Sequence, residues 1–298
     1  MVTPGSIGEV CAERVLVGDG AMGTLLQAAG LEPGSCGEVW NLQHPDRVEA
    51  IQRAYVEAGA DCLTTNTFGA SPLGLRRHGL EHELVPINRE GVAIARRAFG
   101  GRPGFVLGEL GPFGGLLEPY GTFSSAEVRE GFAAQARILV EAGVDAIIIE
   151  TMSSLEELEL SILAAREAGA PWVIATMAFN AVRGGEDFRT MMGVSPEQAA
   201  EAMERWGANM TGANCGAEVD SARAVEIARR MHRACGLPLA VQPNAGTPVL
   251  QSGRIVYPHE PAVFASQVLN LTAAGARLVG ACCGSTPDHI AAIREQLK

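Results

Sequence analysis

Short, continuously apolar runs recur along the chain, and a glycine that ends a helical pattern stands before each of them. The clearest copies are EAGADCLTT with Gly59, EAGVDAIIIE with Gly143 and AAGARLVGA with Gly275. Further copies carry Gly169, Gly207 and Gly236, and a looser one carries Gly100. Glycine in this place caps a helix in the left-handed conformation. The runs lack alternation, which is typical of strands buried on both faces. The pattern predicts repeated helix–strand units.

The helix before the second run shows the pattern best. Its predicted apolar face carries Val48, Ile51, Tyr55 and Ala58. Pro45 stands near the start and Gly59 at the end, the positions that these two residues favour in helices. Another helix begins near Ser124, because Glu127 follows at the spacing of a capping box.

With a first run at 14–17, the chain holds about eight strands separated by helices, and no break in composition divides them. Eight such units favour a single α/β domain over 1–298, a closed (β/α)8 (TIM) barrel. An open doubly wound sheet is the competing arrangement.

Composition narrows the classes of partner. The net charge is -11, which disfavours nucleic acid and anionic membranes. We see no apolar stretch long enough to cross a bilayer and no signal-peptide pattern in residues 1–15. Seven cysteines are too few for a disulfide scaffold in a chain of 298 residues. These features favour a reduced, cytoplasmic protein.

Polar side chains stand where nearly every predicted strand ends. They are Asp19, Asn66, Glu109, Glu150, Asn214 with Cys215, Asn244, and Cys282 with Cys283. In a (β/α)8 barrel these ends meet at one mouth, where reactive groups lie. Exposed strand ends are often polar, but this tendency does not account well for a ring of side chains that includes three thiols.

The three thiols suggest a metal site. Cys215 ends the sixth predicted strand, and Cys282 and Cys283 close the eighth, so all three can meet at the mouth. Zn²⁺ suits three thiolates, and a fourth position left open is typical of catalytic zinc. Such an anionic centre would favour attack by a bound thiolate. The alternative, that these cysteines are small buried apolar residues, stays open on spacing alone.

The chain resembles the zinc-dependent homocysteine S-methyltransferases, and most of all the homocysteine module of cobalamin-dependent methionine synthase. The matching segments, in order, are GDGAMGTLLQ (18–27), EAGADCLTTNTFGAS (57–71), GELGPFG (108–114), IIIETMSSLEEL (147–158), GANCG (212–216), QPNAG (242–246) and GACCGSTPDHI (280–290). GACCG with an upstream NCG is the most specific of these, and together they cover nearly the whole chain.

This resemblance implies a (β/α)8 barrel that binds zinc through Cys215, Cys282 and Cys283 and methylates homocysteine to methionine. It implies that Glu150, helped by Asp19, faces the substrate ammonium. The substrate carboxylate would meet backbone N–H groups from Gly20 through Ala21 to Met22.

The resemblance also places Asn244 near the metal, in the open position before substrate arrives, and puts Asn66 and Thr67 at the mouth. Two structural alternatives remain. Asp19 could instead cap the first helix after its strand, and Asn66 could only fix a loop.

Other functions fit the sequence less well. GDGAMG (18–23) matches the GxGxxG pattern of dinucleotide sites, but the next unit offers no clear acidic strand end. A Schiff-base aldolase needs an internal lysine, and the single lysine is Lys298. A non-catalytic structural zinc protein would want four protein ligands, and we find three.

The identity of the methyl donor is the property that the sequence constrains least. Methylcobalamin on a separate corrinoid protein is preferred, with a sulfonium such as S-methylmethionine second and betaine third. Betaine needs an aromatic cage, and Gly69 stands where betaine enzymes of this family carry an aromatic residue. Trp40 and Tyr120 could still supply rings.

Overall fold

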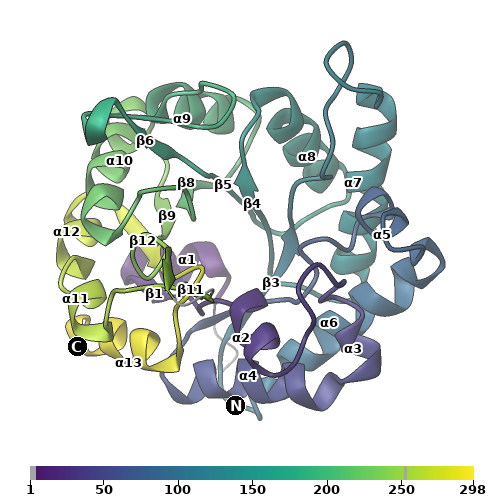
Figure 1. Ribbon diagram of the computed structural model, residues 1–298, viewed down its shortest axis with the longest axis horizontal. Coiled ribbons are helices and arrows are strands. Elements are labelled where there is room, and N and C mark those ends of the chain that lie inside the picture. The colour runs from purple at the N-terminus through teal and green to yellow at the C-terminus, as the bar shows by residue number, and fades with distance from the viewer. Residues whose placement is uncertain (1–4, 252–253) are drawn as a thin grey trace.

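The centre of the molecule is a ring of eight parallel strands surrounded by helices (Figure 1). This computed structural model describes residues 5–251 and 254–298. The strands of the ring are Leu16–Val17 (β1), Cys62–Thr64 (β2), Phe105–Leu110 (β3), Ala146–Met152 (β4), Val173–Met177 (β5), Met210–Asn214 (β8), Leu239–Gln242 (β9) and Ala276–Val279 (β12). They lie in the order β1-β12-β9-β8-β5-β4-β3-β2. The N–H of Asp61 donates to Val17 O at 2.7 Å and links the two ends of this order. The predicted (β/α)8 barrel is confirmed.

Helices stand between consecutive strands and at both ends of the chain, and most of them surround the ring (Figure 1). They are Ile7–Glu13 (α1), Gly23–Ala28 (α2), Trp40–Gln43 (α3), Pro45–Glu57 (α4), Pro72–Arg76 (α5), Leu84–Ala98 (α6), Ser125–Glu141 (α7), Leu155–Glu167 (α8), Pro196–Arg205 (α9), Ser221–Ala234 (α10), Pro261–Ala265 (α11), Val268–Ala273 (α12) and Pro287–Gln296 (α13), with short 3₁₀ turns at Glu81–Glu83 and Arg183–Gly185.

The glycine pattern was read correctly at all but one position. The φ angles of Gly59, Gly143, Gly169, Gly207, Gly275 and Gly100 are all positive. The prediction for Gly236 is wrong: α10 ends earlier, at Ala234, and its cap is Cys235 with an extended backbone at φ −142°. Ser124 caps α7 by accepting from the Glu127 N–H.

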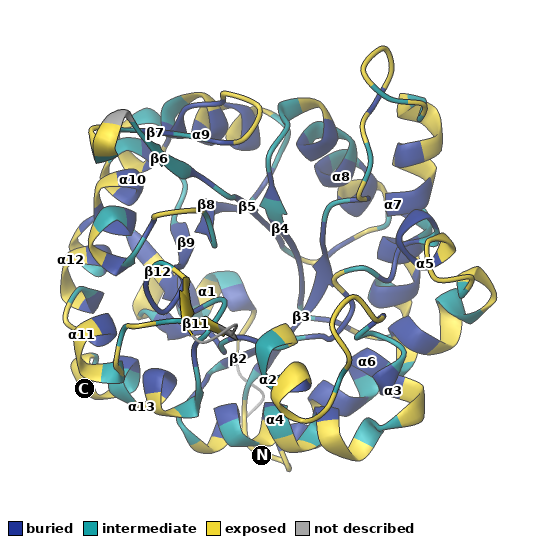
Figure 2. Cartoon of the chain, viewed as in Figure 1, coloured by how far each residue is buried: buried dark blue, intermediate teal, exposed yellow. Residues whose placement is uncertain are grey.

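Buried residues make up most of the ring and the helix faces that lie toward it (Figure 2). The N-terminal end of the barrel is closed by α1, whose Ile7 and Cys11 pack with Leu16 and Cys62. Cys62 is fully buried there. These two thiols therefore belong to the core, and the opposite end of the barrel is left for the site.

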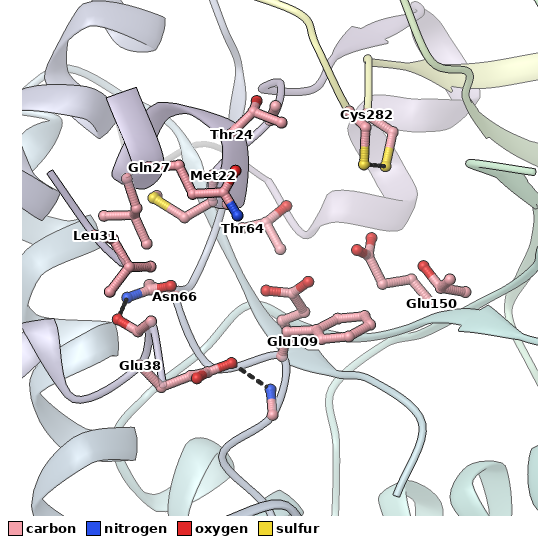
Figure 3. A pocket seen from close by; sticks show the side chains of 18 of the residues that line it. Met22, Thr24, Gln27, Leu31, Glu38, Thr64, Asn66, Glu109, Glu150 and Cys282 are labelled. Carbon is pink, nitrogen blue, oxygen red and sulfur yellow. Dashed lines mark hydrogen bonds between the residues drawn. The ribbon is translucent and has the colours of Figure 1, made fainter. Parts of the chain in front are cut away.

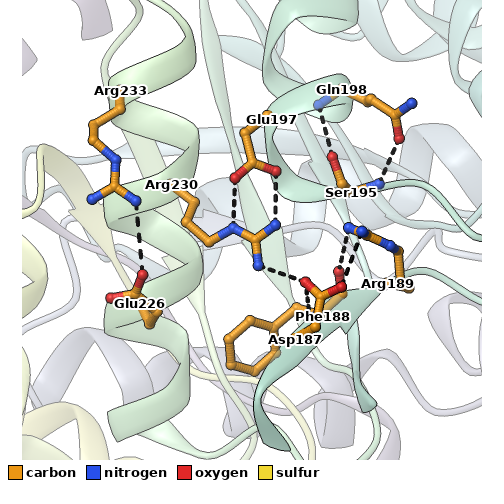
Figure 4. A network of polar contacts seen from close by, with 9 residues as sticks. All are labelled: Asp187, Phe188, Arg189, Ser195, Glu197, Gln198, Glu226, Arg230 and Arg233. Atoms are coloured by element: carbon orange, nitrogen blue, oxygen red, sulfur yellow. Dashed lines mark hydrogen bonds and ion pairs between the residues drawn. The ribbon is translucent and has the colours of Figure 1, made fainter. Parts of the chain in front are cut away.

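Two hairpins, which the sequence did not predict, interrupt the repeat after β5 and β9. They are Asn180–Val182 (β6) with Asp187–Arg189 (β7), and Val249–Gln251 (β10) with Arg254–Val256 (β11). The first is fastened to α9 and α10 by Arg230, which donates to both oxygens of Glu197 at 2.6 and 2.8 Å and to Asp187 at 2.8 Å (Figure 4). Within the described ranges, no helix is long and apolar enough to cross a membrane.

Candidate metal and substrate site

Cys215 follows directly on β8 and turns out of the strand direction. Its φ is 54°, in the left-handed region, and Gly216 continues the turn at φ 96°. The Cys215 N–H donates to Gln242 O at 3.1 Å, which ties this turn to the end of β9. The turn redirects the chain at the point where the strand would otherwise keep alternating.

Cys282 and Cys283 lie beyond their strand. The predicted strand end is wrong by three residues, because β12 ends at Val279. The Cys282 N–H donates to Pro243 O at 2.8 Å, and Gly284 turns the chain at φ 79°. Because the pair stands in a loop, the alternation of a strand does not apply, and the two sulfurs lie 3.9 Å apart on the same side.

The three sulfur atoms form a cluster that could hold a metal ion. All lie within 4.8 Å of one another. Tetrahedral zinc with bonds of about 2.3 Å separates two ligand sulfurs by about 3.8 Å. The neighbouring thiols lower the pKa of Cys215, whereas the same contacts and burial raise the pKa of Cys282 well above its usual value. Because the pKa of Cys282 is raised, all three thiols can be ionised together only with a positive charge beside them.

Asn244 supplies a further sign that the cluster is a ligand site. Its side-chain nitrogen donates to Gly216 O at 3.1 Å, while its side-chain oxygen is buried without a partner in the described residues. The side chain also hydrogen-bonds Cys215 and helps to lower the pKa of that thiol. A buried oxygen without a partner is costly, and a cation beside it would remove that cost. The residues present therefore fit a metal.

A cavity of about 430 Å³ opens beside the thiols at the C-terminal end of the barrel. Its lining includes the three cysteines, Asp19, Gly20, Ala21, Asn66, Glu109, Glu150 and Gln242. In Figure 3 the carboxyl groups of Glu109 and Glu150 point into the space next to Cys282, and Glu38 and Asn66 lie on the far side. A small polar molecule can thus reach sulfur and carboxylate together.

Glu109 and Glu150 form a buried pair of carboxyl groups on the neighbouring strands β3 and β4. Burial and the charge of Glu150 raise the pKa of Glu109 well above its usual value. Burial also raises the pKa of Glu150, which Glu109 counteracts by donating a hydrogen bond. Two buried carboxyl groups on neighbouring strands resist ionising together, so the pair favours a cationic ligand group beside it.

Asp19 is a third carboxyl group in this cavity. It accepts from the Thr64 N–H at 2.7 Å and from the Thr64 hydroxyl at 3.0 Å, and burial raises its pKa to about 7. It does not cap α2: Met22 holds the N-cap position, and that helix has no side-chain cap. The helix-cap alternative for Asp19 is therefore wrong.

Two hydrogen bonds occupy part of the backbone that follows Asp19. The Ala21 N–H donates to the Ser285 hydroxyl at 3.0 Å, and the Tyr55 hydroxyl donates to Ala21 O at 2.8 Å. These contacts fix the segment from Gly20 to Met22 against α4 and the cysteine loop.

The remaining predicted side chains fall in different places. Asn66 lines the cavity, but its amide nitrogen donates to Gly37 O and to Asn41 Oδ1, both at 3.0 Å, so it also fixes a loop. Thr67 does not line the cavity. It is fully buried, and its hydroxyl donates to Glu109 O at 2.9 Å, so the structure places it behind the site.

Sequence reasoning gave no role to several residues that shape the cavity. Thr64 and Ser285 hold Asp19 and Ala21, and Glu109 forms a buried carboxyl pair with Glu150. Gln242 lines the cavity with a buried side-chain oxygen that has no partner in the described chain. Glu109 and Gln242 both lie at strand ends within the segments that match the family, and this position was the signal that could have identified them.

Comparison with known proteins agrees with this geometry. The family model for homocysteine S-methyltransferase matches residues 16–297. The methionine synthases of Mycobacterium tuberculosis and Mycobacterium leprae are 36% and 35% identical over 296 residues, which cover 95% of this chain and 24% of each relative. The chain thus spans about a quarter of the length of these relatives.

Solved structures share the fold. The metallated form of the homocysteine methyltransferase MmuM from Escherichia coli superposes with a TM-score of 0.78 at 22% identity, and its oxidized form with 0.75 at 25% identity. Each comparison covers 95% of this chain and 96% of the other. The chain belongs to the homocysteine S-methyltransferase family.

Proposed function

We propose that this chain is a homocysteine-binding barrel domain that uses zinc to transfer a methyl group to the sulfur of homocysteine, which yields methionine. The observation that carries the proposal is the shared cavity, in which three thiols stand beside a buried carboxyl pair. One end of that cavity suits a soft metal and a substrate thiol, and the other suits an ammonium group.

The cysteines are the proposed metal ligands, and they leave one position for substrate. Zinc, when bound, would lower the pKa of the incoming thiol and hold its sulfur in place. The ligand set of Cys215, Cys282 and Cys283 with Zn²⁺ sums to minus one, which keeps that sulfur electron-rich. Asn244, whose buried oxygen has no partner in the described residues, would occupy the open position until homocysteine arrives.

The carboxyl groups are the proposed contacts for the substrate ammonium. Glu150 with Glu109 would bind it, because a positive charge beside two buried carboxyl groups favours their ionised forms and pairs with them. Asp19 adds negative charge from the opposite wall and is held by Thr64. The substrate carboxylate would then lie against the Gly20–Met22 backbone, which α4 and Ser285 fix in place.

Methylcobalamin carried by a corrinoid protein is the proposed donor, with S-methylmethionine second. The relatives from M. tuberculosis and M. leprae are both named methionine synthase, which favours methylcobalamin. Betaine is disfavoured further, because neither Trp40 nor Tyr120 lines the cavity: Trp40 is buried elsewhere and Tyr120 is 80% exposed. The seven free cysteines agree with a reducing, cytoplasmic compartment.

The test is methionine formation by the zinc-loaded protein from homocysteine with methylcobalamin, S-methylmethionine or betaine. We expect methionine with methylcobalamin, and loss of both zinc and activity in Cys283→Ser. Cys235→Ser is the matched control, since Cys235 lies at the end of α10 and outside the cavity. Methionine from none of the three donors would instead support a non-catalytic zinc protein.

A further inference from the structure

Two residues of the site other than glycine have left-handed backbone, and each belongs to one half of the site. Thr151, with φ 62°, directly follows Glu150 on β4. Cys215, with φ 54°, directly follows Asn214 on β8. This conformation is uncommon for residues other than glycine and rarer still for a β-branched residue such as threonine. It persists only where the surroundings hold it.

Asn214 holds Thr151 at two points. Its side-chain oxygen accepts from the Thr151 N–H at 2.8 Å, and its side-chain nitrogen donates to the Thr151 hydroxyl at 2.7 Å. The same oxygen accepts from the Thr176 hydroxyl at 2.7 Å, on the strand between β4 and β8. Asn214 is 2% exposed and does not line the cavity, so it touches the site only through its neighbours.

The chain on either side of this amide carries the functional groups. Glu150 is the residue before Thr151, and Cys215 is the residue after Asn214, so one side chain joins the two segments across β5. Strands β4 and β8 each pair with β5, where Met177 lies opposite both Met152 and Ala213, but they do not pair with each other, so their ends have no direct backbone connection. The hydrogen bonds of Asn214 supply that connection.

We propose that Asn214 is a positioning residue that clamps Thr151 in its left-handed conformation and so sets the distance between the Glu150 carboxylate and the Cys215 thiol. This inference rests on the proposed function, in which the first group binds the homocysteine ammonium and the second binds the metal. It predicts that metal affinity and homocysteine binding depend on one residue that contacts neither ligand.

The test measures metal affinity of the apo-protein by competition with a chelator, and homocysteine binding to the metal-loaded protein without turnover. In Asn214→Ala we expect metal affinity to fall 10- to 100-fold, the usual effect of removing a group that orients a ligand. We expect homocysteine affinity to fall at least 10-fold. Thr151→Val, which keeps the β-branched shape and removes only the hydroxyl, should reproduce the loss of homocysteine affinity. Thr151→Ser, which keeps the hydroxyl, should bind homocysteine as wild type does.

Asn209→Ala is the matched control. Asn209 also joins β5 and the start of β8, by accepting from the Val173 N–H at 2.9 Å, but it lies at the opposite end of the barrel. We expect this variant to lose thermal stability with both affinities within twofold of wild type.

A further variant separates positioning from general support. Glycine adopts the left-handed conformation without strain, so in a Thr151→Gly background the Asn214→Ala change should weaken homocysteine binding much less than in wild type. Equal losses of homocysteine affinity from Asn214→Ala in the Thr151→Gly and wild-type backgrounds would overturn the proposal. Wild-type affinities in both Asn214→Ala and Thr151→Val would overturn it as well. If wild type itself retained neither metal nor homocysteine, the proposed function would fail instead.

Discussion

At the scale of single residues, the proposed function assigns the choice of substrate to the acidic end of the cavity. Glu109 and Glu150 are both buried, and burial raises the pKa of each, so a cation beside them would favour their charged forms. Removing one carboxylate leaves the other without its partner and weakens the attraction for a cation. The effect should fall on substrate binding rather than on the sulfur chemistry.

We therefore expect Glu150→Gln to raise the KM for homocysteine about 10- to 100-fold with a smaller change in kcat, since a hydrogen bond to a charged group contributes about 1.5–3 kcal/mol. Steady-state kinetics at saturating donor measures both constants. Glu156→Gln, an exposed glutamate of the following helix, is the control and should behave as wild type. A variant in which kcat alone fell would assign Glu150 another role.

The sequence predicted part of this residue-level arrangement. The thiols and Glu150 were found because they end apolar runs within matching motifs. The coupling between the buried carboxyl groups of Glu109 and Glu150 depends on how closely two strands bring these side chains, which no local pattern encodes. Thr67 was misplaced for a related reason: its neighbour Asn66 faces the cavity, and the chain turns between them.

At the scale of elements, the loop after β3 is held over the barrel by a buried acid. Glu157 in the first turn of α8 accepts from the Phe113 N–H at 2.7 Å, and burial raises its pKa to about 7. A raised carboxyl pKa means that the folded protein binds more protons than the unfolded chain between about pH 4.5 and 7. Stability contributed by this group is therefore full below that window and lost as pH rises through it.

Glu157→Gln keeps the acceptor oxygen for Phe113 and removes the charge. We expect the free energy of unfolding of the variant to match wild type near pH 4, below that window, and to exceed it at pH 8, by at most about 3 kcal/mol. Urea unfolding at the two pH values measures this, and all other titrating groups are common to both proteins. If the free energy of unfolding of wild type rose relative to that of the variant as pH increases, the assignment would be contradicted.

The elements themselves were predicted where the apolar runs are long and preceded by a glycine cap. The hairpins β6–β7 and β10–β11 were missed because their strands have three residues each and pair only with each other. The end of β12 was misplaced because Gly280 and Ala281 continue the apolar run after the ladder stops. Hydrophobicity marks burial there and does not mark strand pairing.

At the scale of the whole molecule, the barrel brings together thiols that are 67 residues apart in the sequence. Strand β9 lies between β8 and β12, and its end accepts from both sides: Gln242 O from the Cys215 N–H, and Pro243 O from the Cys282 N–H. One short segment therefore fixes both halves of the proposed ligand set. The repeat of helix and strand made this closure predictable, whereas the shared bridge became visible only in three dimensions.

X-ray absorption at the zinc edge, with and without homocysteine, tests the central claim most directly. We predict three sulfur neighbours and one lighter neighbour at zinc in the free protein, and four sulfur neighbours after homocysteine is added. Fewer than three sulfur neighbours in the free protein, or a shell that homocysteine leaves unchanged, would contradict the account.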